Sequence, residues 1–422
     1  MNLRKSFVAT ILLAGSLSAF AQTTKYVGGD ISLLKAYEDK NAVYKDSLGN
    51  TIKGGVLPFL KERGLNTMRV RLFHTPSNAT ASEKGQGVFQ DLAYVKALGK
   101  QIKDNGQRFM LDIHYSDTWA DPSNQWLPKA WEGLSNEVLQ DSVYQYTKRV
   151  LTELKAAGAT PDFVQTGNEI SYGMLWGKNG SAQKKYYASQ TANLSYFVSM
   201  LKSAGKACRE VCPDAEIILH TERVANPSYI VSFYKDMDNN GVDYDIIGTS
   251  YYSYYHGFLP QLDKALTSIE NYSKKPIMVV ETGYYYQYQP NNIDYNYSST
   301  YPVTPAGQKQ FAKDLIALLN KHEQVNGLFW WEMDANDGSG SVWSAQHVLD
   351  GWYNAGLWNE GTNSANPALY ELCRFNGQDP TGVEAISVKK NAKSNAVYNL
   401  AGQMVSEDYK GIIIKDGKKI LK

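Results

Sequence analysis

The chain has 422 residues and a formal net charge of +1. Its Lys and Arg residues are mixed with Asp and Glu along the sequence and form no cluster that could follow a phosphate backbone. The composition therefore argues against a nucleic-acid partner. With 9 Trp and 30 Tyr, the chain is rich in the aromatic side chains that pack in large cores and stack on sugar rings.

The first residues have the pattern of a secretory signal peptide. Arg4 and Lys5 precede an apolar run from Phe7 to Leu17, and Ala19-Phe20-Ala21 supplies the small residues of a cleavage site. We expect residues 1–21 to be removed and the mature protein to be secreted, to the periplasm, the cell surface or the medium. No other apolar stretch is long enough to predict a membrane span.

Three cysteines are an odd number for a protein sent to an oxidising compartment. Cys208 and Cys212 are one turn apart on a predicted helix, and Cys373 is distant in sequence. We expect buried free thiols, and the alternative is a single internal disulfide.

Short apolar, β-branched segments alternate with helical patterns along most of the chain, which is typical of parallel strands with right-handed helical crossovers. Eight such strands predict an α/β fold, a (β/α)₈ barrel over residues 22–377. The expected strands are 26–29, 67–73, 108–114, 162–168, 216–221, 245–250, 277–280 and 327–331, and the expected helices include 55–62, 91–104, 135–157, 190–211, 259–272 and 305–321.

The character of the sequence changes near residue 378. Gln378-Asp379-Pro380-Thr381-Gly382 is typical of a linker, and the rest holds short β-like runs with a hairpin turn. We interpret residues 378–422 as a linker and a short β-rich tail. The tail resembles the C-terminal sorting elements of many secreted proteins of the Bacteroidetes.

Two expected strands alternate charged and apolar residues. Arg69 and Arg71 alternate with Met68, Val70 and Leu72, and Asp112 and His114 alternate with Leu111 and Ile113. The apolar set would face the helices, which directs the charged set into the barrel. Buried charges require partners, so a polar network is expected there. It could be an ion-pair cluster without a chemical role.

Two glutamates follow expected strands four and seven. Glu169 ends Gly167-Asn168-Glu169, and Glu281 follows Ile277–Val280. Barrel active sites lie at the carboxyl ends of the strands, so these two side chains are expected to meet. Glycoside hydrolysis needs one carboxylic acid to protonate the leaving oxygen and one carboxylate to attack or to activate water. Either Glu alone could be an ordinary strand-end residue, but the pair predicts a retaining glycosidase.

The chain resembles glycoside hydrolase family 53, the endo-β-1,4-galactanases, over roughly residues 26–375. The motifs that carry the resemblance are Gly28-Gly29-Asp30, Thr67-Met68-Arg69-Val70-Arg71, Leu111-Asp112-Ile113-His114-Tyr115-Ser116-Asp117, Trp119-Ala120-Asp121-Pro122, Pro128-Lys129-Ala130-Trp131, Gly167-Asn168-Glu169-Ile170 and Ser250-Tyr251-Tyr252.

The resemblance implies a role for each matching residue. Glu169 would be the acid/base, Glu281 the nucleophile, and Asn168 a contact to the sugar 2-hydroxyl. The other matching residues would bind the substrate or shape its subsites. Tyr251 would hydrogen-bond the nucleophile, and Arg71 and His114 would belong to the polar floor of the site. The subsites would be shaped by Asp117, Trp119 and Trp331.

The resemblance also implies partners and cofactors. The substrate would be β-1,4-galactan or the type I arabinogalactan side chains of pectin, cut internally with retention of configuration by a monomer. No cofactor is required. Some family members bind calcium near the loop after strand eight, which makes Asp334 and Asn336 candidate ligands of a structural calcium ion.

Two other functions stay open at this point. One keeps the mechanism but takes mannan or glucan as substrate. The other is a barrel that binds glycans without cleaving them, which the intact pair of glutamates disfavours.

Overall fold

The computed structural model describes residues 24–338, 346–350 and 354–379, and in the C-terminal segment residues 397–399, 404–406, 410, 412–415 and 418–421. The predicted signal peptide lies outside the described residues. The chain divides into two compact units after Gln378.

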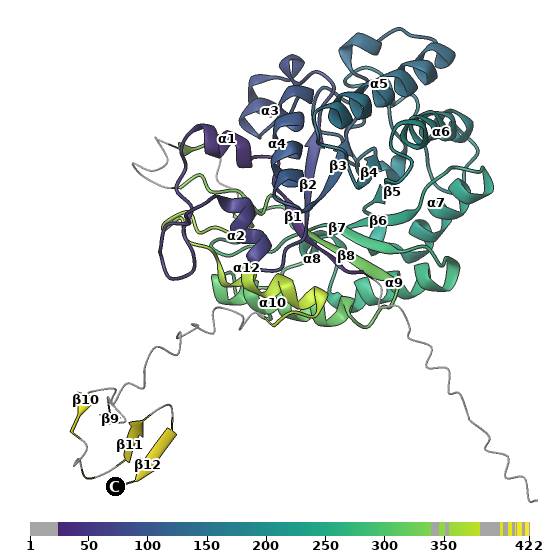
Figure 1. The fold of residues 1–422 in the computed structure, drawn as a ribbon. Coiled ribbons are helices and arrows are strands. Elements are labelled where there is room, and N and C mark those ends of the chain that lie inside the picture. The colour runs from purple at the N-terminus through teal and green to yellow at the C-terminus, as the bar shows by residue number, and fades with distance from the viewer. Residues whose placement is uncertain are drawn as a thin grey trace, which may run out of the picture. The chain divides into compact units, whose positions relative to one another are not determined.

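Eight parallel strands close into a barrel in sequence order, with β8 paired to β1 (Figure 1). They are β1 (Tyr26–Asp30), β2 (Thr67–Leu72), β3 (Arg108–Ile113), β4 (Phe163–Thr166), β5 (Glu216–Thr221), β6 (Ile246–Tyr251), β7 (Ile277–Thr282) and β8 (Val325–Trp330). The predicted (β/α)₈ barrel is confirmed.

Helices surround the strands (Figure 1). The longer ones are α2 (Val56–Glu62), α4 (Leu92–Asp104), α5 (Asn136–Ala156), α6 (Leu194–Val211), α7 (Pro227–Asn239), α9 (Leu259–Tyr272) and α10 (Pro305–Leu319). In α6, Phe197, Leu201, Ala204 and Cys208 are buried at helical spacing, and this stripe is the face that packs toward the barrel. Helix α7 was not among the helices that the sequence predicted.

Shorter elements connect these parts. They are α1 (Leu34–Asp39), α3 (Ala81–Gly85), α8 (Ser253–His256), α12 (Pro367–Glu371) and the 3₁₀ turns η1 (Pro76–Asn78), η2 (Lys129–Trp131), η3 (Ile170–Tyr172), η4 (Arg223–Ala225) and η5 (Leu372–Asn376). Turns η3 and η4 follow β4 and β5 directly, so they shape the mouth of the barrel.

The barrel interior has an apolar layer and a polar layer. The apolar layer consists of Met110, Phe163, Ile218, Ile246, Met278, Val280 and Phe329. Nearer the carboxyl ends of the strands, Arg69, Arg71, Asp112 and His114 are almost fully buried. The predicted inward direction of these four side chains is confirmed.

The sheet is irregular between β6 and β7. Thr249 pairs with Val279, but the next residue, Ser250, pairs with Glu281, so Val280 is skipped. Such a bulge re-aims side chains locally. Here it places the Ser250 hydroxyl next to Glu281.

The C-terminal unit contains β9 (Val397–Asn399), β10 (Met404–Val405), β11 (Ile412–Lys415) and β12 (Lys418–Leu421). They form an antiparallel sheet in the order β10-β9-β11-β12. The sequence predicted short strands and a hairpin in this region, and the structure contains both.

Cys208, Cys212 and Cys373 are buried and free, as the sequence predicted. Within the described part of the chain, none of the helices combines the length and the apolarity that a membrane crossing requires.

Candidate active site

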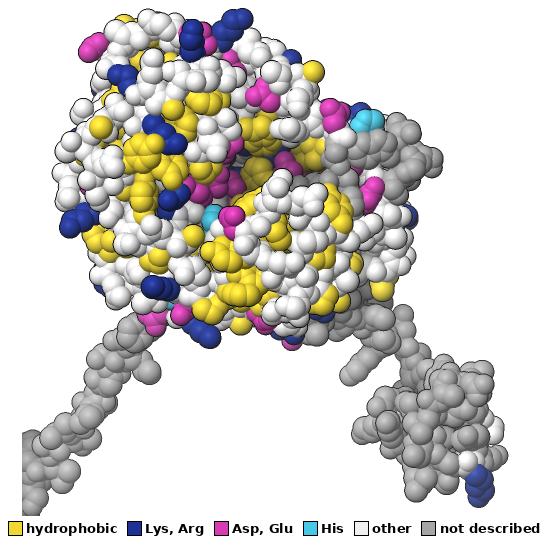
Figure 2. Space-filling model, turned by 180° about the vertical axis from the view of Figure 1, so that it is seen from behind, with side chains coloured by type: hydrophobic (Ala, Val, Ile, Leu, Met, Phe, Trp, Pro, Cys, Tyr) yellow, Lys and Arg dark blue, Asp and Glu magenta, His cyan; other side chains and the backbone are white. Residues whose placement is uncertain are grey.

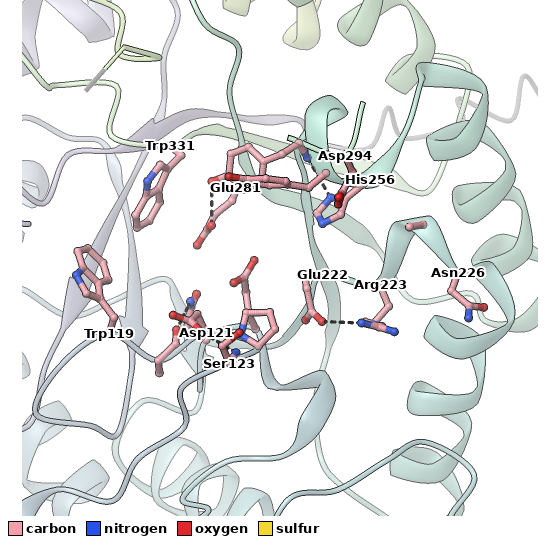
Figure 3. Close-up of a pocket in the computed structure, with 17 residues that line it drawn as sticks. Trp119, Asp121, Ser123, Glu222, Arg223, Asn226, His256, Glu281, Asp294 and Trp331 are labelled. Atoms are coloured by element: carbon pink, nitrogen blue, oxygen red, sulfur yellow. Dashed lines mark hydrogen bonds and ion pairs between the residues drawn. The ribbon is translucent and has the colours of Figure 1, made fainter. Parts of the chain in front are cut away.

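A pocket of about 640 Å³ opens at the carboxyl ends of the strands and is lined by the buried carboxyl groups of Glu222 and Glu281 and by the partly buried carboxyl group of Glu169. Figure 2 shows a hollow in this face of the molecule with acidic side chains at its bottom. Trp119 and Trp331 lie at one end of the pocket, and Arg223 and Asn226 at the other (Figure 3).

Glu169 is positioned by an unusual turn after β4. Gly167 has φ +99°, and a Cβ atom there would lie 2.7 Å from Cγ2 of Ile170. Glu169 itself has φ 47° and ψ 51°, in the left-handed region that a side chain other than glycine rarely adopts. The turn stops the strand and directs the Glu169 carboxyl group into the pocket.

Glu281 belongs to β7 and has a cationic partner. Nη2 of Arg69 lies 2.9 Å from Glu281 Oε1, and the Tyr252 hydroxyl donates a hydrogen bond to Glu281 Oε2 at 3.0 Å. Burial raises the pKa of Glu281 to about 7, and both Arg69 and Tyr252 oppose that rise. Glu281 is the carboxyl group with neighbours that favour its ionised form.

Among the described residues, no cation forms an ion pair with Glu169 or opposes the effect of its burial. Burial and the nearby charges of Glu281 and Glu222 raise the pKa of Glu169 well above its ordinary range. A pair whose environments differ in this way can hold one group protonated and the other ionised at the same pH. The arrangement gives Glu169 the properties of an acid and Glu281 those of an attacking carboxylate.

One hydroxyl group links the two carboxyl groups. Ser250 Oγ donates to Glu169 Oε1 at 2.7 Å and lies 3.5 Å from Glu281 Oε2. His220 Nε2 is 2.8 Å from the same hydroxyl. Contact through a single atom fits the separation of about 5–5.5 Å found in retaining glycosidases, because an inverting pair leaves a wider gap for water.

Arg69 is the centre of the polar layer. Its guanidinium group contacts Asp30 Oδ2 at 3.1 Å and Asp112 Oδ2 at 2.8 Å, and it donates to Asn168 Oδ1 at 2.9 Å. The Asn168 amide also donates to the Ala120 carbonyl at 2.8 Å. These contacts fix Asn168 beside Glu169, so the network is part of the site and not a remote ion-pair cluster.

The two tryptophans share a buried cation. Arg71 lies 4.7 Å from the Trp119 ring centre and 5.3 Å from that of Trp331, and its Nη1 pairs with Asp30 at 3.1 Å. The rings approach edge to face with centres 6.1 Å apart. Rings held this firmly are suited to stacking on a sugar.

Most of the predicted site residues come together. Glu169, Glu281, Asn168, Trp119 and Trp331 all line the pocket. Arg71 and His114 lie beneath it, and His114 is placed by Asp112 at 3.0 Å and by the Ala120 N–H at 3.0 Å.

Two predictions are corrected by the structure. Tyr251 does not contact Glu281: it points outward from the barrel and donates to the Gly257 carbonyl at 2.9 Å, because alternate residues of a strand face opposite sides. Tyr252 makes the predicted contact. Asp117 lines a neighbouring cavity, where Asn78 and the Lys129 N–H hold its Oδ2.

Each candidate calcium ligand has an oxygen atom engaged within the protein, although Asp334 Oδ1 is buried without a hydrogen-bond partner among the described residues. Asp334 Oδ2 accepts from the Leu33 N–H at 2.9 Å, and Asn336 Oδ1 accepts from Asn363 at 2.8 Å. Among the described residues, no group of three or more His, Cys, Asp or Glu side chains could hold a metal ion. The calcium prediction gains no support from this part of the chain.

The predicted set lacked several residues of the site, among them Arg69, Ser250, Tyr252 and Glu222. Arg69 carried a signal, since its inward direction followed from strand alternation. Ser250 and Tyr252 alternate on the same side of β6, which would have indicated them once the strand's inner face was known. Glu222 comes after β5 as Glu169 comes after β4. A carboxyl group at this end of a barrel strand would have indicated Glu222 as a residue of the site.

Comparisons with known proteins agree with this geometry. Residues 26–383 match Glycosyl hydrolase family 53. An uncharacterized protein from the bgaB 5′ region of Niallia circulans is 34% identical over 79% of this chain and 89% of its own length. The endo-beta-1,4-galactanase of Bacillus subtilis is 29% identical over 83% of this chain and 82% of its own. The solved catalytic domain of the family 53 enzyme of Ignisphaera aggregans superposes with a TM-score of 0.70 and 30% identity, over 83% of this chain and 96% of that domain.

Proposed function

Because the chain belongs to glycosyl hydrolase family 53, we propose that it is an endo-β-1,4-galactanase that cuts galactan and the type I arabinogalactan side chains of pectin. The protein is a glycoside hydrolase. The observation that carries the residue assignment is the contact of Ser250 Oγ with both the Glu169 and the Glu281 carboxyl groups.

In the first step, ionised Glu281 attacks the anomeric carbon while protonated Glu169 gives its proton to the glycosidic oxygen. The bond between that carbon and oxygen breaks, the shortened chain leaves, and a glycosyl ester forms on Glu281. Arg69 and Tyr252 support this role because they stabilise the negative charge of Glu281 before attack.

In the second step, Glu169, now a carboxylate, takes a proton from water as the water attacks the same carbon. The ester to Glu281 breaks and the sugar is released with its original configuration. Two carboxyl groups and water account for every bond and proton, so the reaction needs no cofactor.

The sugar attacked by Glu281 would lie against Trp331, with Trp119 next to it and Asn168 at its 2-hydroxyl. Support for this placement is the position of the two rings beside Glu281 in the pocket (Figure 3). The Asn168 amide, held by Arg69 and by the Ala120 carbonyl, lies at the side of Glu169.

Incubation with β-1,4-galactan tests the substrate. We expect short galacto-oligosaccharides that keep the β configuration when first released, as measured by chromatography and NMR. Mannan and β-glucan, assayed beside galactan, test the open alternative. Release from either at the galactan rate would contradict the galactan assignment.

Glu169→Gln and Glu281→Gln test the two roles. Each is expected to lower kcat by several orders of magnitude, while galactan affinity stays close to that of the wild type. Glu153→Gln, in α5 and outside the pocket, is the control and should keep full activity. An unchanged kcat in either pocket variant would remove that residue from the mechanism.

We further propose that the protein is exported, that signal peptidase cuts after Ala21, and that residues 378–422 serve sorting rather than catalysis. The basic and apolar residues of the first 21 positions support export. Amino-terminal sequencing of the protein recovered from the native cell envelope and medium tests the cut and the location. We also propose a monomer, which light scattering tests.

A further inference from the structure

A third carboxyl group of the pocket has no role in the two-step reaction. Glu222 follows β5, lines the pocket, and is only 6% exposed. The Ser171 hydroxyl donates to its Oε1, but its Oε2 is buried without a hydrogen-bond partner among the described residues. A buried carboxylate oxygen normally has a partner, so this one is arranged for a donor that arrives with a ligand.

The next residue supplies the complementary group. Arg223 lines the same pocket, and its Nη1 lies 3.7 Å from Glu222 Oε1. Its guanidinium carbon sits over two tyrosine rings, 4.9 Å from the centre of Tyr172 and 4.6 Å from that of Tyr229. The Nε of Arg223 is buried and unpaired within the described part of the chain. Two neighbouring side chains thus each have one polar atom, Glu222 Oε2 and Arg223 Nε, without a hydrogen-bond partner in the described structure.

The position of this pair in the pocket identifies what it would meet. Glu169 follows β4, the strand next to β5, and the Glu222 charge raises the pKa of Glu169. Glu281 and Trp331 lie toward the other end (Figure 3). Because Glu169 protonates the oxygen of the departing sugar, that sugar lies on the side of Glu169 away from Trp331, where Glu222 and Arg223 are found.

We propose that Glu222 and Arg223 bind neighbouring hydroxyl groups of the sugar that departs, with the Glu222 carboxylate accepting one hydrogen bond and the Arg223 guanidinium donating another. Adjacent hydroxyl groups of a hexose present a donor and an acceptor at the spacing of such a pair. This subsite rests on the assignment of Glu169 as the acid.

The substitutions Glu222→Gln and Arg223→Met, each assayed on two substrates, test the proposal. Galactan has a sugar as its leaving group. A nitrophenyl β-galactobioside has a phenolate instead, which carries no hydroxyl pair. We expect kcat/KM on galactan to fall about 10- to 100-fold, the loss of one hydrogen bond to a charged group. The loss on the nitrophenyl substrate is expected to be at least tenfold smaller.

Transfer to an added sugar provides a second readout. The glycosyl ester on Glu281 can be attacked by a galactose acceptor, which must occupy the same subsite. Both variants are expected to give less transfer product relative to hydrolysis. Arg149→Met is the matched control, because Arg149 also lies over a tyrosine ring, at 5.5 Å from the centre of Tyr146, but is outside the pocket.

Two results would overturn the subsite. Equal losses on both substrates would assign Glu222 and Arg223 to the placement of Glu169, and unchanged rates on both would remove them from sugar binding. Failure of the acid assignment is detected separately, since Glu169→Ala should lose galactan cleavage yet form the glycosyl ester from the nitrophenyl substrate. Thermal unfolding of each variant identifies one that fails to fold.

Discussion

Glu169 and Glu281 are the same residue type in one pocket, and their neighbours give them different chemistry. Glu281 forms an ion pair with Arg69 and accepts a hydrogen bond from Tyr252, whereas Glu169 accepts one from Ser250 and faces two other carboxyl groups. The active form has Glu281 ionised and Glu169 protonated. Activity should therefore appear as pH rises through the pKa of Glu281 and disappear as pH rises through that of Glu169.

Tyr252→Phe tests this division at the level of one atom. The lost hydroxyl stabilised the ionised form of Glu281, so its pKa should rise from about 7 in the wild type. We expect the acidic limb of kcat/KM against pH to move to higher pH by about one unit, the equivalent of one hydrogen bond to a charged group. The basic limb should stay in place.

A Tyr251→Phe variant is the control for the same experiment, because the Tyr251 hydroxyl contacts only the Gly257 carbonyl among the described hydrogen bonds. It should leave both limbs where they are. A shift with Tyr251→Phe, or none with Tyr252→Phe, would contradict the assignment of the contact to Tyr252.

The turn between β4 and η3 is the element that positions the side chain of Glu169, the proposed acid. Gly167 and Glu169 both have positive φ, so the chain turns sharply and the Glu169 side chain enters the pocket. Tyr115 after β3 and Glu332 after β8 are also in the left-handed region. Unfavourable backbone conformations at these strand ends are held by the packed barrel beneath them.

Gly167→Ala tests the turn. Both the positive φ and the close approach to Ile170 oppose a methyl group, so we expect a loss of about 1–3 kcal/mol in the free energy of unfolding. A misplaced Glu169 should also lower kcat by about 100-fold. Denaturant unfolding and galactan kinetics measure the two effects.

Gly158→Ala is the matched control, because it introduces the same kind of backbone strain at a glycine where the added methyl group touches no other residue. Gly158 has φ +76°, and a Cβ atom there would meet nothing within 4 Å. This variant should lose stability through the backbone and keep the wild-type kcat. Normal kcat in Gly167→Ala would show that the turn does not control the acid.

At the scale of the whole molecule, the active site belongs to one of the two compact units. Every residue that lines the pocket lies between Trp119 and Trp331, and the unit that contains them ends at Gln378. The barrel is closed without the C-terminal strands, since β8 pairs with β1. We therefore expect its core and its catalytic groups to need no contribution from the tail.

A chain of residues 22–378 tests this independence. We expect its melting temperature to lie within about 2 °C of that of residues 22–422, and its kcat/KM on galactan within about twofold, because a domain with its own core folds alone. Differential scanning calorimetry and galactan kinetics measure both. A large loss of stability or rate would assign the tail a structural role in catalysis.

The sequence by itself determined the barrel, the two catalytic candidates and three more residues that line the pocket, Asn168, Trp119 and Trp331. Strand and helix periodicity are local properties, and the parallel topology brings the residues that follow β4 and β7 to one end whatever their separation in the chain. The alternation of side chains along a strand, which is also local, made the inward direction of Arg69 and Arg71 predictable. Loop length does not affect these arguments, which is why they held.

Only the tertiary structure decided which neighbour each catalytic group has. The inner face of β6 and its bulge gave the contact to Tyr252 instead of Tyr251. The stagger of the strands brought Arg69 to Glu281 and Arg71 to the tryptophans. The loop after β3 places Asp117 in another cavity. Contacts between side chains of different strands depend on register to within one residue, and local sequence does not encode that register.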